Sequence, residues 1–188
     1  LGGRASYWID PTGNRSIDQV ASGGAGLAWL PFDEQRSYRI SDQALWLQFD
    51  ASTARGARWF LVLMHPSVDM AKLYWRGADG RWVVQSAGQQ LSVAEWAIPG
   101  RLPTFELAPG DGQTVRYWLR LERDRSYFTA PLSLFGQSAL LEARGREQFM
   151  LGGYFGVLLF LAGASLVSAL VYRGRNFAAL LGYLGGIG

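Results

Sequence analysis

The sequence predicts an all-β domain, a jelly-roll-like β-sandwich, followed by a transmembrane α-helix. Two observations lead to this prediction. Short runs rich in aromatic and β-branched residues recur along most of the chain, and turn signals separate them. Residues 150–172 then form a stretch of 23 residues without one charged side chain. At a rise of about 1.5 Å per residue this stretch is about 34 Å long, enough to cross a hydrocarbon core of about 30 Å.

Seven or more short strands are expected ahead of the apolar stretch. The Asp-Gly pair at 79–80 separates two of the runs and predicts a hairpin. Many short strands with regularly spaced turns favour a sandwich or a jelly roll. No helical period is visible before residue 137. The expected strands are 45–50, 58–64, 70–76, 81–85, 104–107, 115–122 and 131–135.

Alternation along these strands divides each into an apolar face and a mixed face. In the run 115–122, Tyr117 and Leu119 fall on one side while Trp118 and Arg120 fall on the other. The run 58–64 is apolar on both faces, which suits a central strand. Aromatic planes can cover the C–H faces of a sugar while polar groups bind its hydroxyls. The mixed faces hold Trp46, Gln48, Lys72, Tyr74, Trp118 and Arg120.

Five residues are candidates for ligand binding. Trp118 beside Arg120 is the preferred platform, although core packing is the alternative for every Trp, and above all for Trp46. Arg101 follows a Pro-Gly turn and could reach over a concave face, and its alternative is a solvated loop charge. The candidates are Lys72, Tyr74, Arg101, Trp118 and Arg120.

Composition argues against several other functions. The chain has a net charge of +3 and no basic run, so no nucleic-acid partner is expected. It has no Cys, which excludes disulfides, thiol catalysis and Cys-based zinc sites. His65 is the sole His and lacks a ligand pattern, so no metal site is expected. No phosphate loop or Gly-x-Ser-x-Gly elbow is present, so we expect no cofactor, no catalytic residues and no enzyme activity in this portion.

The expected organisation has four parts. A sandwich domain spans 1–140, a linker helix 141–149, a first transmembrane helix 150–172, and the start of a truncated second transmembrane helix 177–188. Arg173 and Arg175 follow the span directly and favour a cytoplasmic C-terminal side, so residues 1–148 are expected in the periplasm. The natural protein is expected to continue past the second span.

The order of several segments resembles a known family. Along the chain stand 9–13 (IDPTG), 44–49 (ALWLQF), 59–63 (WFLVL), 79–82 (DGRW), 117–121 (YWLRL), 131–134 (PLSL) and 152–156 (GGYFG). This order resembles the type 2 extracellular domain of the 7TM-DISM receptors, seven-transmembrane receptors with diverse intracellular signalling modules. The resemblance implies a periplasmic sensor similar to carbohydrate-binding-module jelly rolls, seven spans, and a cytoplasmic histidine kinase or diguanylate cyclase.

The expected function is therefore the sensing of a carbohydrate-related ligand in the periplasm by a bacterial transmembrane signalling receptor of the inner membrane. The alternative is a ligand-free dimerisation or protein-interaction module of the same receptor type, and a third reading is a membrane-anchored glycan-processing enzyme. The expected partners are a glycan or small-molecule ligand, the membrane, and a second copy or a partner receptor.

Overall fold

The computed structural model describes residues 5–23, 26–40, 43–122 and 127–172 of the chain. The chain divides into two compact units, residues 1–138 and residues 139–188, and each is described by itself. The first unit contains all the strands of the described residues, and the second consists of helix in its described part.

The larger sheet of the first unit has six antiparallel strands in the order β2-β1-β4-β9-β6-β7. The pair β6–β7 is the hairpin predicted at residues 79–80, and Gly80 adopts the positive φ of 75° that its turn requires. Strand β6 has the predicted bounds, β4 and β9 extend the predicted runs by one to three residues, and β7 starts one residue later and ends two residues later than predicted. The strands are β1 (Ala5–Asp10), β2 (Leu30–Pro31), β4 (Ala44–Ser52), β6 (Met70–Arg76), β7 (Trp82–Ala87) and β9 (Thr114–Glu122).

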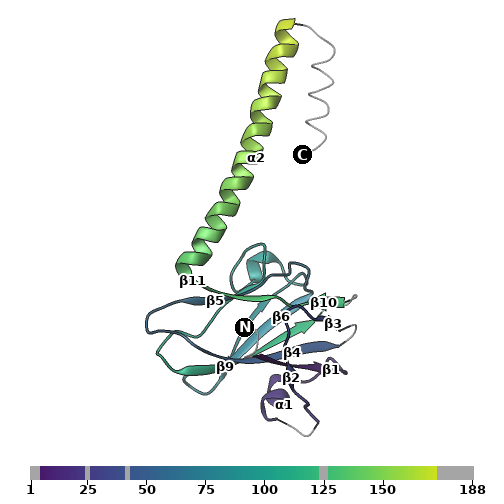
Figure 1. Ribbon diagram of the computed structural model, residues 1–188, viewed down its shortest axis with the longest axis vertical. Helices are drawn as coiled ribbons and strands as arrows, with labels where there is room; N and C mark the ends of the chain where they lie inside the picture. Colours follow the sequence, from purple (N-terminus) through teal and green to yellow (C-terminus); the bar gives the residue numbers. More distant parts are fainter. Residues whose placement is uncertain (1–4, 24–25, 41–42, 123–126, 173–188) are drawn as a thin grey trace. The chain divides into compact units, whose positions relative to one another are not determined.

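The second layer is a three-stranded antiparallel sheet in the order β11-β5-β8 (Figure 1). Its middle strand is the run that is apolar on both faces, as predicted. Two short strands, β3 (Ser37–Arg39) and β10 (Tyr127–Thr129), form a separate pair. The members of the three-stranded sheet are β5 (Trp59–Leu63), β8 (Thr104–Glu106) and β11 (Leu132–Gly136).

One apolar core fills the space between the two sheets. The larger sheet contributes the side chains that alternation placed on its apolar face, and the smaller sheet contributes its own. Full burial of each such side chain stabilises the fold by roughly 1.5–3 kcal/mol. This arrangement confirms the predicted β-sandwich, while its jelly-roll detail stays a prediction. Among the members are Leu47, Phe49, Leu73, Tyr117, Leu119, Leu61, Leu63, Phe105 and Leu132.

A short helix, α1 (Ile17–Ala21), packs on the opposite face of the larger sheet, away from β5 and β11 (Figure 1). The sequence shows no helical period before residue 137, yet the structure has α1 there and a 3₁₀ turn, η1 (Val93–Glu95). Five residues are too few to display a helical period. The available signal was the capping box. The Ser16 hydroxyl accepts a hydrogen bond from the Gln19 amide, and the side-chain oxygen of Gln19 accepts one from the Ser16 amide.

Helix α2 (Gln137–Tyr172) is continuous over 36 residues, and from Ala139 onward it makes up the described part of the second unit. It begins directly after β11 ends at Gly136, so the expected linker helix and the first span lie in one helix. The stretch Phe149–Ser168 is long and apolar enough to cross a membrane. The expected second span, 177–188, lies outside the described residues.

Candidate functional site

Three neighbouring strands of the larger sheet bring the predicted mixed face together. On β4 and β9, Trp46 lies opposite Arg120. On β6 and β9, Lys72 lies opposite Arg120, and Tyr74 lies opposite Trp118. Four of the five candidate residues therefore share one surface, which we call the outer face. Arg101 lies in the loop ahead of β8, a strand of the other sheet, and is not brought to the outer face.

The aromatic residues of the outer face are packed rather than open to solvent. Trp118 is 8% exposed, Tyr74 is 9% exposed and Trp46 is fully buried. Trp118 and Trp82 pack edge to face with ring centroids 5.4 Å apart, and Trp46 stacks on Tyr74 at 5.8 Å. Val20 of α1 is buried against the same cluster. The predicted aromatic platform is therefore covered in this structure.

The covering segment, residues 10–23, starts in a turn that Asp10 organises. One carboxylate oxygen of Asp10 accepts hydrogen bonds from the Thr12 amide (3.0 Å) and hydroxyl (2.7 Å). The other oxygen accepts from the Arg15 amide at 2.8 Å. Burial would raise the pKa of Asp10, but these hydrogen bonds outweigh it, and the pKa lies below its usual value. Gly13, at the positive φ of 65°, completes the turn.

A second attachment holds the covering segment at α1. Asp18 accepts a hydrogen bond from the Trp82 indole at 2.7 Å, and Arg76 approaches the same oxygen at 3.4 Å. The Arg76 guanidinium also lies 3.9 Å from the centroid of the Trp82 ring, a cation–π contact. Asp18 is exposed, so its ion pair with Arg76 contributes little by itself.

Arg120 is the polar centre of the outer face. Its Nη2 donates to the carbonyl of Gly13, and its Nη1 pairs with Glu122 at 2.9 Å. Its guanidinium lies 5.8 Å from the centroid of the Trp46 ring. Burial raises the pKa of Tyr74, although the charge and a hydrogen bond of Arg120 act in the opposite direction.

Three buried N–H groups of the outer face have no acceptor among the described residues. They are Trp46 Nε1, Trp118 Nε1 and Arg120 Nε. Buried donors are nearly always hydrogen-bonded in native proteins, so an unpartnered set needs an explanation. Chemically, such N–H donors match an oxygen acceptor. Periodicity placed these residues on one face, but it contained no signal that their N–H groups would lack partners.

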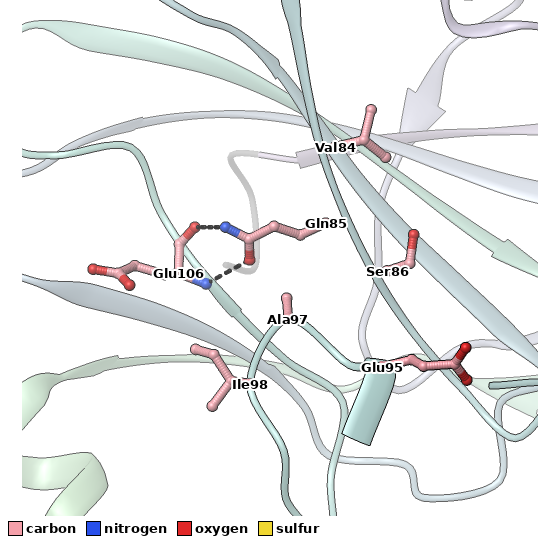
Figure 2. Close-up of a pocket in the computed structure, with 7 residues that line it drawn as sticks. All are labelled: Val84, Gln85, Ser86, Glu95, Ala97, Ile98 and Glu106. Carbon is pink, nitrogen blue, oxygen red and sulfur yellow. Dashed lines mark hydrogen bonds between the residues drawn. The ribbon is translucent and has the colours of Figure 1, made fainter. Parts of the chain in front are cut away.

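A second feature, a cleft of about 450 Å³, lies between β7, β8 and the segment that follows η1 (Figure 2). At this cleft the Gln85 amide donates to the Glu106 carbonyl (3.0 Å), and its oxygen accepts from the Glu106 N–H (2.9 Å). The Glu106 carboxylate is held by Arg58 at 2.6 and 2.8 Å, which lowers the pKa of Glu106. The sequence reasoning missed this site. The signal in the sequence was a polar residue, Gln85, which alternation places with Val83 and Ala87 on the core-facing side of the strand.

The part of the chain that the structure describes contains no group of three or more His, Asp or Glu residues that could hold a metal ion. His65 lies at the end of β5, where its Nδ1 accepts a hydrogen bond from the Ser67 amide at 3.3 Å. That contact is an ordinary turn interaction.

Comparison with known proteins adds one informative match. The model of the family described as 7TMR-DISM extracellular 2 matches residues 2–136. No curated protein matches the chain. Among solved structures, the chain is similar to the crystal structure of the GH31 alpha-xylosidase from Xanthomonas citri, at 15% identity and a TM-score of 0.30. The alignment covers 71% of this chain and 13% of that one, and a likeness this weak carries no argument.

The family match and the structure agree on the character of the chain. The matched family is an extracellular sensory domain of receptors rather than a catalytic one. Together with the apolar stretch Phe149–Ser168, it indicates a membrane protein with an exterior domain. The match spans most of the chain and confirms the resemblance that the order of sequence segments suggested. The chain belongs to the 7TMR-DISM extracellular 2 family.

Proposed function

We propose that residues 1–138 are the periplasmic ligand-sensing domain of a bacterial signalling receptor in the inner membrane, and that the ligand is carbohydrate-related. The observation that carries this proposal is the outer face, where aromatic rings and unpartnered N–H donors occur together. A sugar needs both, because its C–H faces pack on aromatic planes while its oxygens accept hydrogen bonds.

The connection between β11 and α2 supports a signalling role. Strand β11 pairs with β5 along its whole length, and the helix starts at the next residue. The Gln137 amide still donates to the Arg58 carbonyl at 3.1 Å, so the first residue of the helix is tied to the sandwich. A ligand that favours one arrangement of the sheets would thereby bias the helix by its difference in affinity for the two arrangements.

A glycan-array screen tests the ligand class. The full chain, held in lipid nanodiscs, should bind a defined subset of glycans, and soluble forms of those glycans should compete for binding. Trp59→Ala is a control variant, because Trp59 is a partly exposed Trp on the three-stranded sheet and not on the outer face. The control variant should keep the binding pattern. An array without any specific signal, with correctly folded protein, argues against a carbohydrate ligand.

A reporter fusion tests the location. A reporter that is active only in the periplasm should be active when it is fused after Gln148, because positive charge at Arg173 and Arg175 retains the other end in the cytoplasm. Activity of a cytosol-only reporter at the same position would reverse the orientation.

The second candidate function is a dimerisation or protein-interaction module, and strand β7 favours it. This strand is at the end of the larger sheet, and Val84 on it is 48% exposed. An apolar strand at a sheet edge can pair with another chain. Sedimentation of the nanodisc-embedded chain should then show a dimer that Val84→Lys converts to monomer. A monomer at all concentrations excludes a self-association role.

A further inference from the structure

The three unpartnered donors of the outer face lie close together in the sheet. Trp46 and Arg120 are direct cross-strand partners on β4 and β9, so their side chains stand next to each other. Trp118 is two residues from Arg120 on the same strand and therefore on the same face. Trp46 is fully buried and Trp118 nearly so, so solvent does not satisfy their indole N–H groups.

The charges around these donors favour an anion. Lys72 lies opposite Arg120 on β6, and both project from the outer face. Glu122 pairs with Arg120 and offsets one of the two positive charges. One positive charge remains among these three residues, and a cationic donor such as Arg120 forms its strongest hydrogen bonds with an anionic acceptor.

The number of donors distinguishes a carboxylate from a hydroxyl group. A hydroxyl oxygen has two lone pairs and must also place its own proton on an acceptor. A carboxylate offers about four lone-pair sites and needs no acceptor in return. Three donors around one acceptor therefore match a carboxylate, with its four lone-pair sites, better than a neutral sugar hydroxyl with two.

We propose that the outer face binds the carboxylate of a small acid, either a sugar acid or a simple organic acid, through Trp46 Nε1, Trp118 Nε1 and Arg120 Nε. This inference rests on the proposed function and deepens it by naming the chemical group that is recognised. In the structure, the carbonyl of Gly13 occupies an acceptor position on Arg120. The incoming carboxylate replaces the Gly13 carbonyl as the acceptor for Nη2 of Arg120. The covering segment, residues 10–23, then moves away from Arg120.

The attachment of the covering segment suits this exchange. Its last part is held by Asp18, whose side chain is 71% exposed. Exposed ion pairs are weak, so the ion pair between Asp18 and Arg76 adds little to the cost of opening, which the burial of Val20 mainly sets. Weakening the attachment should favour the open form and raise the apparent affinity for the ligand, because less of the binding free energy is used for opening.

Isothermal titration calorimetry on the full chain in detergent micelles tests the proposal with three probes. D-Glucuronate and acetate carry a carboxylate, whereas D-glucose does not. Binding of D-glucuronate alone identifies a sugar acid, and equal binding of acetate identifies the carboxylate as the whole determinant; either result supports the proposal. Equal binding of D-glucose and D-glucuronate would overturn it and leave the proposed carbohydrate sensor intact. No heat from either carboxylate at about 10 mM would also overturn it, and the donors are then met by internal water.

Variants separate this site from any other carboxylate site. Trp118→Phe keeps a ring but removes one N–H, and Arg120→Lys keeps the charge but removes Nε; each should weaken binding about 10-fold or more. If one variant fails to fold, as judged by circular dichroism, the other decides the outcome. Asp18→Asn should bind about 3- to 10-fold tighter. Asp79→Asn, an exposed carboxylate in the β6–β7 turn, is the matched control and should leave affinity unchanged. Affinities equal to that of the natural chain in the first two variants exclude the outer face as the site, and no gain in Asp18→Asn excludes the displacement of the covering segment.

Discussion

The side-chain amide of Gln85 pairs with the main chain of Glu106 in both directions, in the manner of one strand pairing with another. The two residues belong to different sheets, since β7 ends the six-stranded sheet and β8 ends the three-stranded one. Gln85 therefore joins the two layers at one side of the sandwich (Figure 2). The main chain of Glu106 would otherwise have two unpaired groups beside the cleft.

Replacing Gln85 with Leu should destabilise the sandwich by about 1–3 kcal/mol, because the part-buried N–H and C=O of Glu106 then lack partners. Urea denaturation followed by circular dichroism measures the change. Gln90→Leu, at an exposed position shortly after β7, is the control and should shift stability by less than about 0.5 kcal/mol. Equal stability of both variants would show that water satisfies Glu106 as well as Gln85 does.

Removal of the Trp118 ring should lower the free energy of unfolding by about 3–5 kcal/mol, the usual range for a large core aromatic. The reason is its burial between Trp82 and the covering segment. Chemical denaturation of Trp118→Ala provides the value, with Trp59→Ala as an exposed control. A loss of only about 1 kcal/mol would mean that Trp118 is accessible in solution.

Alternation along the sequence was sufficient to predict the long strands of the larger sheet. Long alternating runs such as 70–76 and 115–122 predicted their strands within one residue and assigned their two faces, because a period of two is unambiguous over seven or more residues. Four ligand candidates came together for the same reason. Arg101 did not, because a loop position has no periodicity that assigns it to a sheet.

The covering of the outer face could not be predicted from those runs. Val20, which packs in the cluster around Trp118, comes from a part of the chain far from β9 in sequence, and α1 is too short to show a period. Asp10 was noticed only as part of a family-like segment. Its role follows from the Asp-Pro-Thr-Gly order, since an Asp side chain often bonds main-chain amides that follow it in a turn.

Asp10→Ala should destabilise the first unit by about 2–3 kcal/mol, because three donors lose a buried charged acceptor. Thermal and urea unfolding measure the loss. Asp111→Ala is the matched control, since that exposed carboxylate accepts one hydrogen bond, from the Gln113 amide, and should cost less than about 1 kcal/mol. Similar losses in both variants would contradict the role assigned to the turn at residues 10–15.

Acid should destabilise the sandwich. Hydrogen bonds to Asp10 outweigh its burial and lower its pKa, and hydrogen bonds from Arg116 and Arg58 lower the pKa of Asp50 and Glu106. A carboxyl group with a lowered folded pKa stabilises the fold fully above its unfolded pKa, near 4, and loses that contribution as pH falls through the folded value. The melting temperature should be level between about pH 7 and 5 and fall below about pH 4. Asp10→Ala should show a shallower fall, and a melting temperature that rises on acidification would contradict this sign.

Residues 1–138 should fold alone, because the sandwich core lies entirely within this unit. Far-ultraviolet circular dichroism of the fragment should show strand with little helix, since its described helices are only α1 and η1. A strongly helical spectrum, or a spectrum of an unfolded chain, would show that the fragment depends on the rest of the protein.

The aromatic cluster of the outer face also allows the intrinsic fluorescence of the protein to report on its conformation. Of the eight Trp residues in the chain, the cluster contains Trp8, Trp29, Trp46, Trp82 and Trp118. Indole emission responds to the polarity around the ring, and these five rings are covered in part by a segment attached through Asp18 and the Gly13 carbonyl. If that segment moves as proposed, the surroundings of Trp82 and its neighbours in the cluster should change, and the fluorescence of the unlabelled chain should detect the movement.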